Sequence, residues 1–161
     1  MTIMREMMSK LRLTVNETKT RLCRMPEETF DFLGYTIGLC WSPKTGTSYI
    51  GTKPSAKKID RIKREISDQT SCRWLWTDVE DRVARLNRIL QGWSNYFCLG
   101  PVSASYRAVD CHARHRLRQW LRRKHKRASR GTTRFPDQYL HDVLGLVRLC
   151  DRPKSFPWAK A

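Results

Sequence analysis

The stretch VARLNRILQGWSNYF, residues 83–97, decides how the rest of the chain is organised. Apolar side chains recur through it at alternating steps of four and three residues, which is the spacing of one helix face. Together with Val79, which precedes the stretch, these positions are Val83, Leu86, Leu90, Trp93 and Phe97. Thr77 and Glu80 match a capping box, which predicts a helix from about Asp78 to Gly100–Pro101. We expect this helix to form the core, with all of the basic residues before or after it.

Two further helices are predicted from the same kind of periodicity. Residues 55–68 would begin at Ser55 and carry a narrow apolar stripe, and residues 103–126 would carry a longer one. The two stripes are Ile59, Ile62 and Ile66, and Tyr106, Val109, Ala113, Leu117, Trp120 and Leu121. A short fourth helix is expected after Pro136.

The region before these helices is typical of a small sheet. We expect a short amphipathic helix over residues 2–12 and a strand over 20–25. Residues 30–39 read as one strand, which a turn at 43–46 joins to a return strand at 47–51. The predicted fold class is α+β, with a small N-terminal β-hairpin unit followed by a bundle of three long helices and a short fourth.

Composition predicts a polyanionic partner. The formal net charge is +17 in 161 residues, while a hydrophobic content of 40% is sufficient for a core. Nucleic acid is the first candidate partner and an anionic membrane surface the second. No apolar run approaches the ~18 residues that span a bilayer, and the N-terminus lacks the apolar centre of a signal peptide, so a cytoplasmic location is expected.

Two motifs in this chain resemble one protein family. Residues 86–97, LNRILQGWSNYF, followed by a glycine and a long basic helix, resemble the maturase-specific domain of group II intron reverse transcriptases, also called domain X or the thumb. Residues 13–20, LTVNETKT, and 30–38, FDFLGYTIG, resemble the last two reverse-transcriptase sequence blocks of those proteins. The resemblance covers residues 5–149.

The resemblance implies a domain organisation. Residues 1–52 would be a remnant of the reverse-transcriptase palm, residues 53–149 the maturase-specific thumb, and residues 150–161 a mobile tail. A palm remnant without its sheet neighbours would leave strand edges unpaired, which invites aggregation or a partner.

The residues that match the family motifs are Gly34, Tyr35, Gly92, Trp93, Asn95, Tyr96 and Phe97. We interpret them mainly as structural. Gly34 and Tyr35 would join palm to thumb, Gly92 would permit close helix packing, and Asn95 would tie the helix end to a neighbouring backbone. The alternative is that residues 92–97 form a patch that faces RNA.

Basic side chains on the predicted helices are the candidate RNA contacts, because Lys and Arg neutralise phosphates. They are Lys57, Lys58, Arg61, Arg64, Arg107, Arg114, Arg118, Arg122, Arg123, Lys124, Lys126, Arg127, Arg130 and Arg134. Residues 57–64 would equally suit a solvated helix face, whereas the crowding of cations over 114–130 favours a bound polyanion. Trp74, Trp76 and Tyr106 could stack on unpaired bases, while Trp93 and Trp120 belong to the core.

Polymerase chemistry is not expected from this chain alone. Reverse transcriptases hold two metal ions on palm aspartates, one of them in a Tyr-x-Asp-Asp loop that the family places upstream of residues 13–20. The chain contains no adjacent pair of aspartates. We therefore expect a fragment that begins after the catalytic loop.

A metal site is the sharpest alternative. Cys111, His112 and His115 lie within one predicted helical turn, and Cys98 or His141 could add a fourth zinc ligand. The spacing matches no familiar finger, and a Cys–His nucleophilic pair would lack an oxyanion or orienting group. The six cysteines form no C-x-x-C pair, so we expect reduced thiols. We expect neither a bound metal nor a cofactor.

The predicted function is RNA binding by a maturase-like thumb that assists the folding and splicing of group II intron RNA or another structured RNA. One alternative is the thumb half of a split RNA-directed DNA polymerase, completed by a separate finger–palm polypeptide. Another is a general basic nucleic-acid-binding module.

Overall fold

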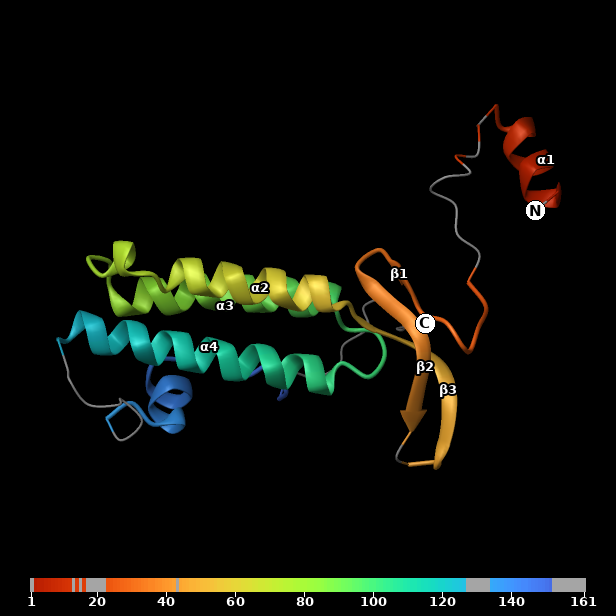
Figure 1. The fold of residues 1–161 in the computed structure, drawn as a ribbon. Helices are drawn as coiled ribbons and strands as arrows, with labels where there is room; N and C mark the ends of the chain where they lie inside the picture. Colours follow the sequence, from red (N-terminus) through yellow and green to blue (C-terminus); the bar gives the residue numbers. More distant parts are fainter. Residues whose placement is uncertain are drawn as a thin grey trace, which may run out of the picture.

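The computed structural model describes residues 2–12, 14, 16, 23–42, 44–126 and 134–151, and the α+β prediction is confirmed for them. In this part of the chain a small antiparallel sheet precedes a bundle of helices that run back and forth beside one another (Figure 1). The elements are α1 (Thr2–Lys10), β1 (Phe30–Phe32), β2 (Tyr35–Ser42), β3 (Thr47–Pro54), α2 (Ala56–Gln69), the 3-10 turn η1 (Cys72–Trp74), α3 (Val79–Tyr96), α4 (Ser103–Lys124) and the π-helical turn η2 (Tyr139–Val143).

The core lies where α2, α3 and α4 meet, and the predicted apolar stripes line it. Ile66, Leu86 and Leu90 have no exposed surface, and neither have Leu117 and Trp120 on α4. The segment after α4 closes the core from below in the view of Figure 1, with Leu140, Leu146 and Leu149 buried against the bundle. Apolar burial of this kind, at about 25 cal/mol per Å², is the main force that holds the helices together.

The ends of α3 differ from the prediction. The capping box is wrong, because the Thr77 hydroxyl donates to the Trp74 carbonyl at 2.7 Å and accepts a hydrogen bond from Arg82 Nη2 at 3.0 Å. Asp78 occupies the N-cap position without a side-chain hydrogen bond. The helix ends at Tyr96 rather than near Gly100, which lies in the following loop with a φ of +77°.

The sheet has one more turn than predicted. Residues 30–39 are not a single strand, because Leu33 and Gly34, with φ of 50° and 85°, form a two-residue turn between β1 and β2. Positive φ at both central positions is the pattern of a type I′ turn, whose twist suits an antiparallel pair. The predicted hairpin of β2 and β3 is confirmed, with Tyr35 opposite Pro54 and Ser42 opposite Thr47.

Of the other N-terminal predictions, one is confirmed and the rest are not. The helix over residues 2–12 is confirmed as α1. Residues 23–25 are not in a strand, and residues 20–22 of the strand predicted at 20–25 lie outside the described residues. Residues 152–161 of the predicted tail also lie outside them. Among the helices that the structure describes, none combines the length and the apolar character needed to cross a bilayer.

The two family motifs meet where the sheet joins the bundle. The Tyr35 hydroxyl donates to the Tyr96 carbonyl at 2.5 Å, and the Tyr96 hydroxyl donates to the Leu33 carbonyl at 2.8 Å. A Cβ at Gly34 would lie 2.8 Å from Lys58 Cε, and one at Gly100 would lie 2.0 Å from the Thr52 carbonyl oxygen. The backbone at Gly100 therefore approaches β3 as closely as glycine permits, while Gly34 lies against the Lys58 side chain.

A buried carboxylate and a half-buried amide fix the segment after α4. The Asp110 carboxylate accepts hydrogen bonds from the backbone N–H groups of Leu149, at 3.0 and 3.1 Å, and Cys150, at 3.2 Å. Asn87 donates to the Gly145 carbonyl at 2.8 Å and accepts from the Val147 N–H at 2.9 Å. The fourth helix predicted after Pro136 is reduced to the turn η2.

Candidate nucleic-acid interface

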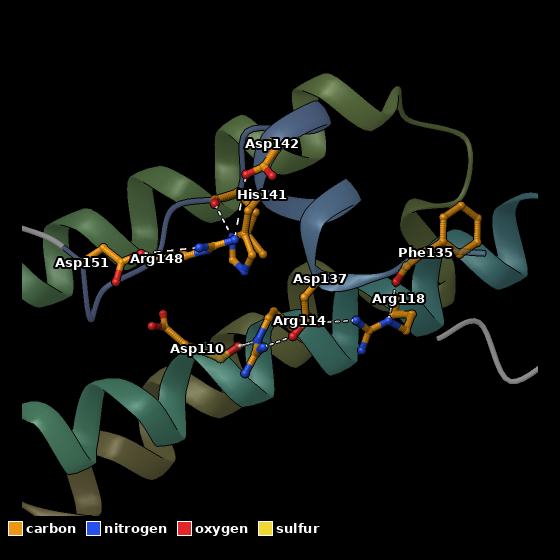
Figure 2. Close-up of polar contacts among 10 residues, drawn as sticks. Asp110, Arg114, Arg118, Phe135, Asp137, His141, Asp142, Arg148 and Asp151 are labelled. Atoms are coloured by element: carbon orange, nitrogen blue, oxygen red, sulfur yellow. Dashed lines mark hydrogen bonds and ion pairs between the residues drawn. The ribbon is translucent and has the colours of Figure 1, made fainter. Parts of the chain in front are cut away.

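Several of the α4 cations that were predicted to contact RNA bind acceptors within the protein. Figure 2 shows the Asp137 carboxylate between Arg114 and Arg118, with the Arg118 Nη2–Asp137 Oδ1 distance at 2.5 Å. The Arg114 and Arg118 side chains are only 29% and 14% exposed, and Arg118 Nε also donates to the Phe135 carbonyl at 2.8 Å. These two guanidinium groups hold the residue 135–137 segment against α4 (Figure 2).

The environment of Asp137 is electrostatically favourable to its charged form. Partial burial raises the pKa of the Asp137 carboxyl, but hydrogen bonds and positive charge from Arg118 and Arg114 outweigh burial. The net result is a pKa below its ordinary value. The carboxylate is therefore charged, and paired, throughout the neutral range.

Two more α4 cations hold the ends of neighbouring elements. Arg116 donates to Thr70 Oγ1 at 3.2 Å and to the Ser67 carbonyl at 3.0 Å, at the end of α2. Lys124 Nζ donates to the carbonyls of Leu75 and Thr77 at 3.1 and 2.7 Å, in the loop before α3. Cations at the carbonyls of helix ends and loops add to the hydrogen bonding of these segments.

The remaining predicted cations of this region have varied surroundings. Arg107, Lys126 and Arg134 are exposed, and Arg122 is half-buried. Arg123 is exposed and donates to Cys72 Sγ at 3.3 Å. Arg127 and Arg130 lie outside the described residues.

By contrast, the outer face of α2 and α3 presents cations that are exposed and unpaired. Within the described part of the chain, Lys57 and Arg61 on α2 and Arg85 and Arg88 on α3 have no side-chain hydrogen bond or ion pair. Arg64 is also exposed, and its Nε donates only to the Asp60 carbonyl of its own helix, at 3.4 Å. We call these five residues, together with the half-buried Lys58, the α2–α3 basic face.

The expectation that basic residues lie only before or after the apolar helix is wrong. Arg85 and Arg88 belong to that helix and are exposed. They lie three residues apart, on the side of the helix away from Leu86 and Leu90. This spacing in the sequence indicates that both arginines share one exposed helix face. Arg82, on the same helix, is instead buried at 6% exposure, and its Nη1 donates to Gln69 Oε1 at 2.9 Å.

A hollow of about 350 Å³ lies between α2 and α3 beside this face. Its rim carries Lys58, Arg61 and Arg88, with one carboxylate, that of Glu65. Its other lining residues are Ile62, Ile89, Gly92, Trp93 and Phe97. The site therefore combines an apolar floor with a net positive rim.

Gly92 is an exposed part of this lining and does not serve the close packing predicted for it. A Cβ at Gly92 would meet no atom within 4 Å. Asn95 is exposed, and the predicted tie to a neighbouring backbone is not formed with any residue that the structure describes. Trp93 and Phe97 pack on one another, with ring centroids 5.0 Å apart.

One known protein family matches the helical part of the chain. The group II intron maturase-specific domain matches residues 59–139, which is half of the chain and runs from α2 to the start of η2. The chain belongs to this family. No curated protein matches the chain.

A second hollow, of about 340 Å³, lies between α4 and the segment after it. Three arginines line it, Arg107, Arg114 and Arg148, and so do the carboxylates of Asp110, Asp137 and Asp151. Arg148 lies 3.8 Å from Asp142 and 3.6 Å from Asp151 (Figure 2). Because its charges are balanced and largely paired, this hollow is a poorer site for phosphate than the α2–α3 basic face.

The candidate base-stacking aromatics of the maturase-specific domain are placed differently from one another. Tyr106 is buried in the core, and its hydroxyl donates to the carbonyls of Ser94 and Phe97, so its predicted role in stacking on bases is wrong. Trp74 is half-buried, with the Arg82 guanidinium 4.5 Å from its ring centroid. Trp76 is 77% exposed and remains available for stacking.

The structure does not bring the alternative zinc ligands together. His112 Nε2 lies 3.0 Å from the Lys63 carbonyl and 2.9 Å from Ser67 Oγ, while His115 Nε2 contacts the Gln119 amide at 2.8 Å. Burial, opposed by the hydrogen bond to Lys63, lowers the pKa of His112. Among the described residues of the maturase-specific domain, no three His, Cys, Asp or Glu side chains are grouped as metal ligands.

Proposed function

We propose that this chain binds structured RNA, with group II intron RNA as the first candidate, through the α2–α3 basic face. The single observation that carries the proposal is that four exposed cations, Lys57, Arg61, Arg85 and Arg88, have no partner among the described residues. They lie on helices that the maturase-specific family model covers. Such side chains contact phosphates without breaking any contact of the folded protein. A net charge of +17 adds long-range attraction to any polyanion.

The mechanism that we propose is stabilisation of one RNA conformation. A protein that binds one fold of an RNA more tightly than its alternatives shifts the population toward that fold. The RNA then performs its own splicing chemistry, and the protein supplies binding energy alone. We assign no catalytic residue, metal or cofactor to the chain, and we expect no template-dependent DNA synthesis from it.

Binding to a panel of nucleic acids at one salt concentration tests this function. The panel contains a folded group II intron RNA, a scrambled RNA of the same length and composition, and a duplex DNA. We expect the folded intron to bind most tightly and to retain that preference as salt is raised, because shape-specific contacts are less sensitive to salt than counterion release. Equal affinity for all three would favour a general basic nucleic-acid-binding module instead.

One observation favours a second candidate, the thumb half of a split RNA-directed DNA polymerase. By register, one face of the sheet collects large apolar side chains from β1, β2 and β3. Of these, Phe32, Leu39, Trp41 and Ile50 are each more than half exposed. An exposed apolar patch of this kind marks a protein contact, and a separate finger–palm polypeptide would be its partner.

Mixing this chain with a finger–palm polypeptide is the test of the second candidate function. If the chain completes a polymerase, adding a finger–palm polypeptide of a group II intron reverse transcriptase restores template-dependent DNA synthesis. Trp41→Ser should then abolish the restored synthesis while leaving the RNA affinity of the chain unchanged. Synthesis that is absent from the mixture, or insensitive to this substitution, contradicts it.

A further inference from the structure

Packing within the protein does not explain the glycine at position 92. Gly92 lies inside α3, where glycine destabilises a helix by about 0.5–1 kcal/mol relative to alanine. A Cβ at Gly92 would meet open space, whereas at Gly34 and Gly100 it would meet Lys58 and Thr52. An exposed helix glycine with free space above it leaves the backbone open to something outside the chain.

The surroundings of Gly92 define the chemistry of that ligand. The hollow is floored by apolar side chains, including Ile89 and the half-buried ring of Trp93. The lining also includes Arg61 from α2 and Arg88 from α3, and neither has an ion pair within the described residues. A volume of about 350 Å³ lies near the lower end of the range of ~300–1,000 Å³ for small-molecule sites.

We propose that this hollow holds one unpaired nucleotide of a bound RNA, with the base over Gly92 and Ile89 and the flanking phosphates at Arg61 and Arg88. The inference rests on the proposed RNA binding and adds to it the place where a single nucleotide is held. It also gives the absence of a side chain at position 92 a purpose, since any side chain there would project into the space for the base.

An unpaired nucleotide fits this site better than a duplex does. A helical stem presents phosphates, sugars and the polar edges of base pairs, and its apolar base faces are hidden by stacking. Only an unstacked base offers a flat apolar face to an apolar floor. The positive rim matches the phosphates on either side of that base, and the single carboxylate of Glu65 does not cancel it.

Two RNA hairpins with the same stem test the proposal on the full chain. One has a single bulged 2-aminopurine nucleotide and the other is fully paired. For Gly92→Leu we expect the affinity for the bulged hairpin to fall about fivefold or more, which is the lower end of what one stacked base contributes. Affinity for the paired hairpin should be unchanged, and the change in 2-aminopurine fluorescence on binding should disappear.

Two further variants keep the test decisive. Ala84→Leu places the same leucine side chain at an exposed position of α3 that does not line the hollow, and it should bind both hairpins like the wild type. Gly92→Ala strengthens the helix, so any loss of affinity for the bulged hairpin in this variant cannot result from unfolding.

The outcomes separate the two levels of the proposal. If the wild type binds both hairpins but the Gly92 variants lose affinity equally for both or for neither, the proposed nucleotide site is wrong. The proposal of RNA binding then remains intact. An unchanged 2-aminopurine signal on binding also overturns the site. Wild-type protein that binds neither hairpin nor folded intron RNA overturns the proposed function, and the site with it.

Discussion

At the scale of single residues, two tyrosines connect the sheet to the bundle. Tyr35 is buried, and its hydroxyl bonds the carbonyl of Tyr96 at the end of α3, while Tyr96 returns a bond to the turn at Leu33. The Tyr35 ring also packs on Phe97, with centroids 5.1 Å apart. Spacing in the sequence indicates that both motifs exist, but no pattern in it shows that they touch across 61 positions.

Removing the Tyr35 hydroxyl should destabilise this joint. Tyr35→Phe leaves the Tyr96 carbonyl without its partner, and we expect the free energy of unfolding in urea to fall by about 1–3 kcal/mol. Tyr49→Phe is the matched control, because Tyr49 is 40% exposed and its hydroxyl has no hydrogen bond to any residue that the structure describes. An equal effect of the two substitutions would show that the Tyr35 hydroxyl contributes nothing.

Tyr35 also predicts a pH dependence at the alkaline end. Burial raises the pKa of its phenol, because the charged form is poorly solvated there. A raised pKa in the folded state means that this contribution to stability is complete below about pH 10 and is lost as the pH rises through the folded pKa. Urea unfolding of wild type and Tyr35→Phe between pH 8 and 11 should show a steeper loss of stability in the wild type.

The Asp137 carboxyl should make stability depend on pH at the acid end of the range. Its pKa is lowered in the folded state, so its contribution is complete above the pKa of the unfolded chain, near 4, and is lost as the pH falls through the folded pKa. Asp137→Asn should therefore be less stable than the wild type at neutral pH and equal to it in strong acid. A stability difference that does not depend on pH would contradict the ion pairs with Arg114 and Arg118.

At the scale of elements, periodicity was enough to predict the helices but not all of their boundaries. The apolar stripes of α2, α3 and α4 follow from spacing alone, because a buried helix face requires it. The turn between β1 and β2 was missed because Leu33 adopts a positive φ that leucine rarely does. The capping box at Thr77 failed because its hydroxyl is engaged by Trp74 and Arg82, contacts that local sequence does not reveal.

The loop after α3 offers a test of how the elements fit together. Gly100 and Gly46 both have positive φ, but only at Gly100 would a Cβ collide with backbone, at Thr52 of β3. Gly46→Ala should cost about 1–2 kcal/mol of unfolding free energy from backbone strain alone. Gly100→Ala should cost about 1–3 kcal/mol more, because the sheet and the loop must move apart. Equal losses, measured by urea unfolding, would contradict the close approach of β3 to this loop.

At the scale of the whole molecule, the candidate site depends on which cations have partners. The sequence predicts a basic surface from a net charge of +17, and it favours the crowded α4 region. It does not predict that Asp137, Thr70 and nearby carbonyls engage Arg114, Arg116 and Arg118, since those contacts depend on tertiary packing. We therefore place the proposed interface on α2 and α3, where Lys57, Arg61, Arg85 and Arg88 have no partner among the described residues.

The most direct test of this account is the salt dependence of RNA affinity in two variants of equal charge. One replaces Lys57, Arg61 and Arg88 with glutamine, and the other replaces the exposed cations Lys10, Arg24 and Lys44 outside the bundle. Each lost phosphate contact flattens the slope of log affinity against log salt by about 0.7–0.9. We predict a slope flatter by about two to three for the α2–α3 variant and an unchanged slope for the other. Equal slopes in the two variants would contradict the proposal that RNA lies on the α2–α3 basic face.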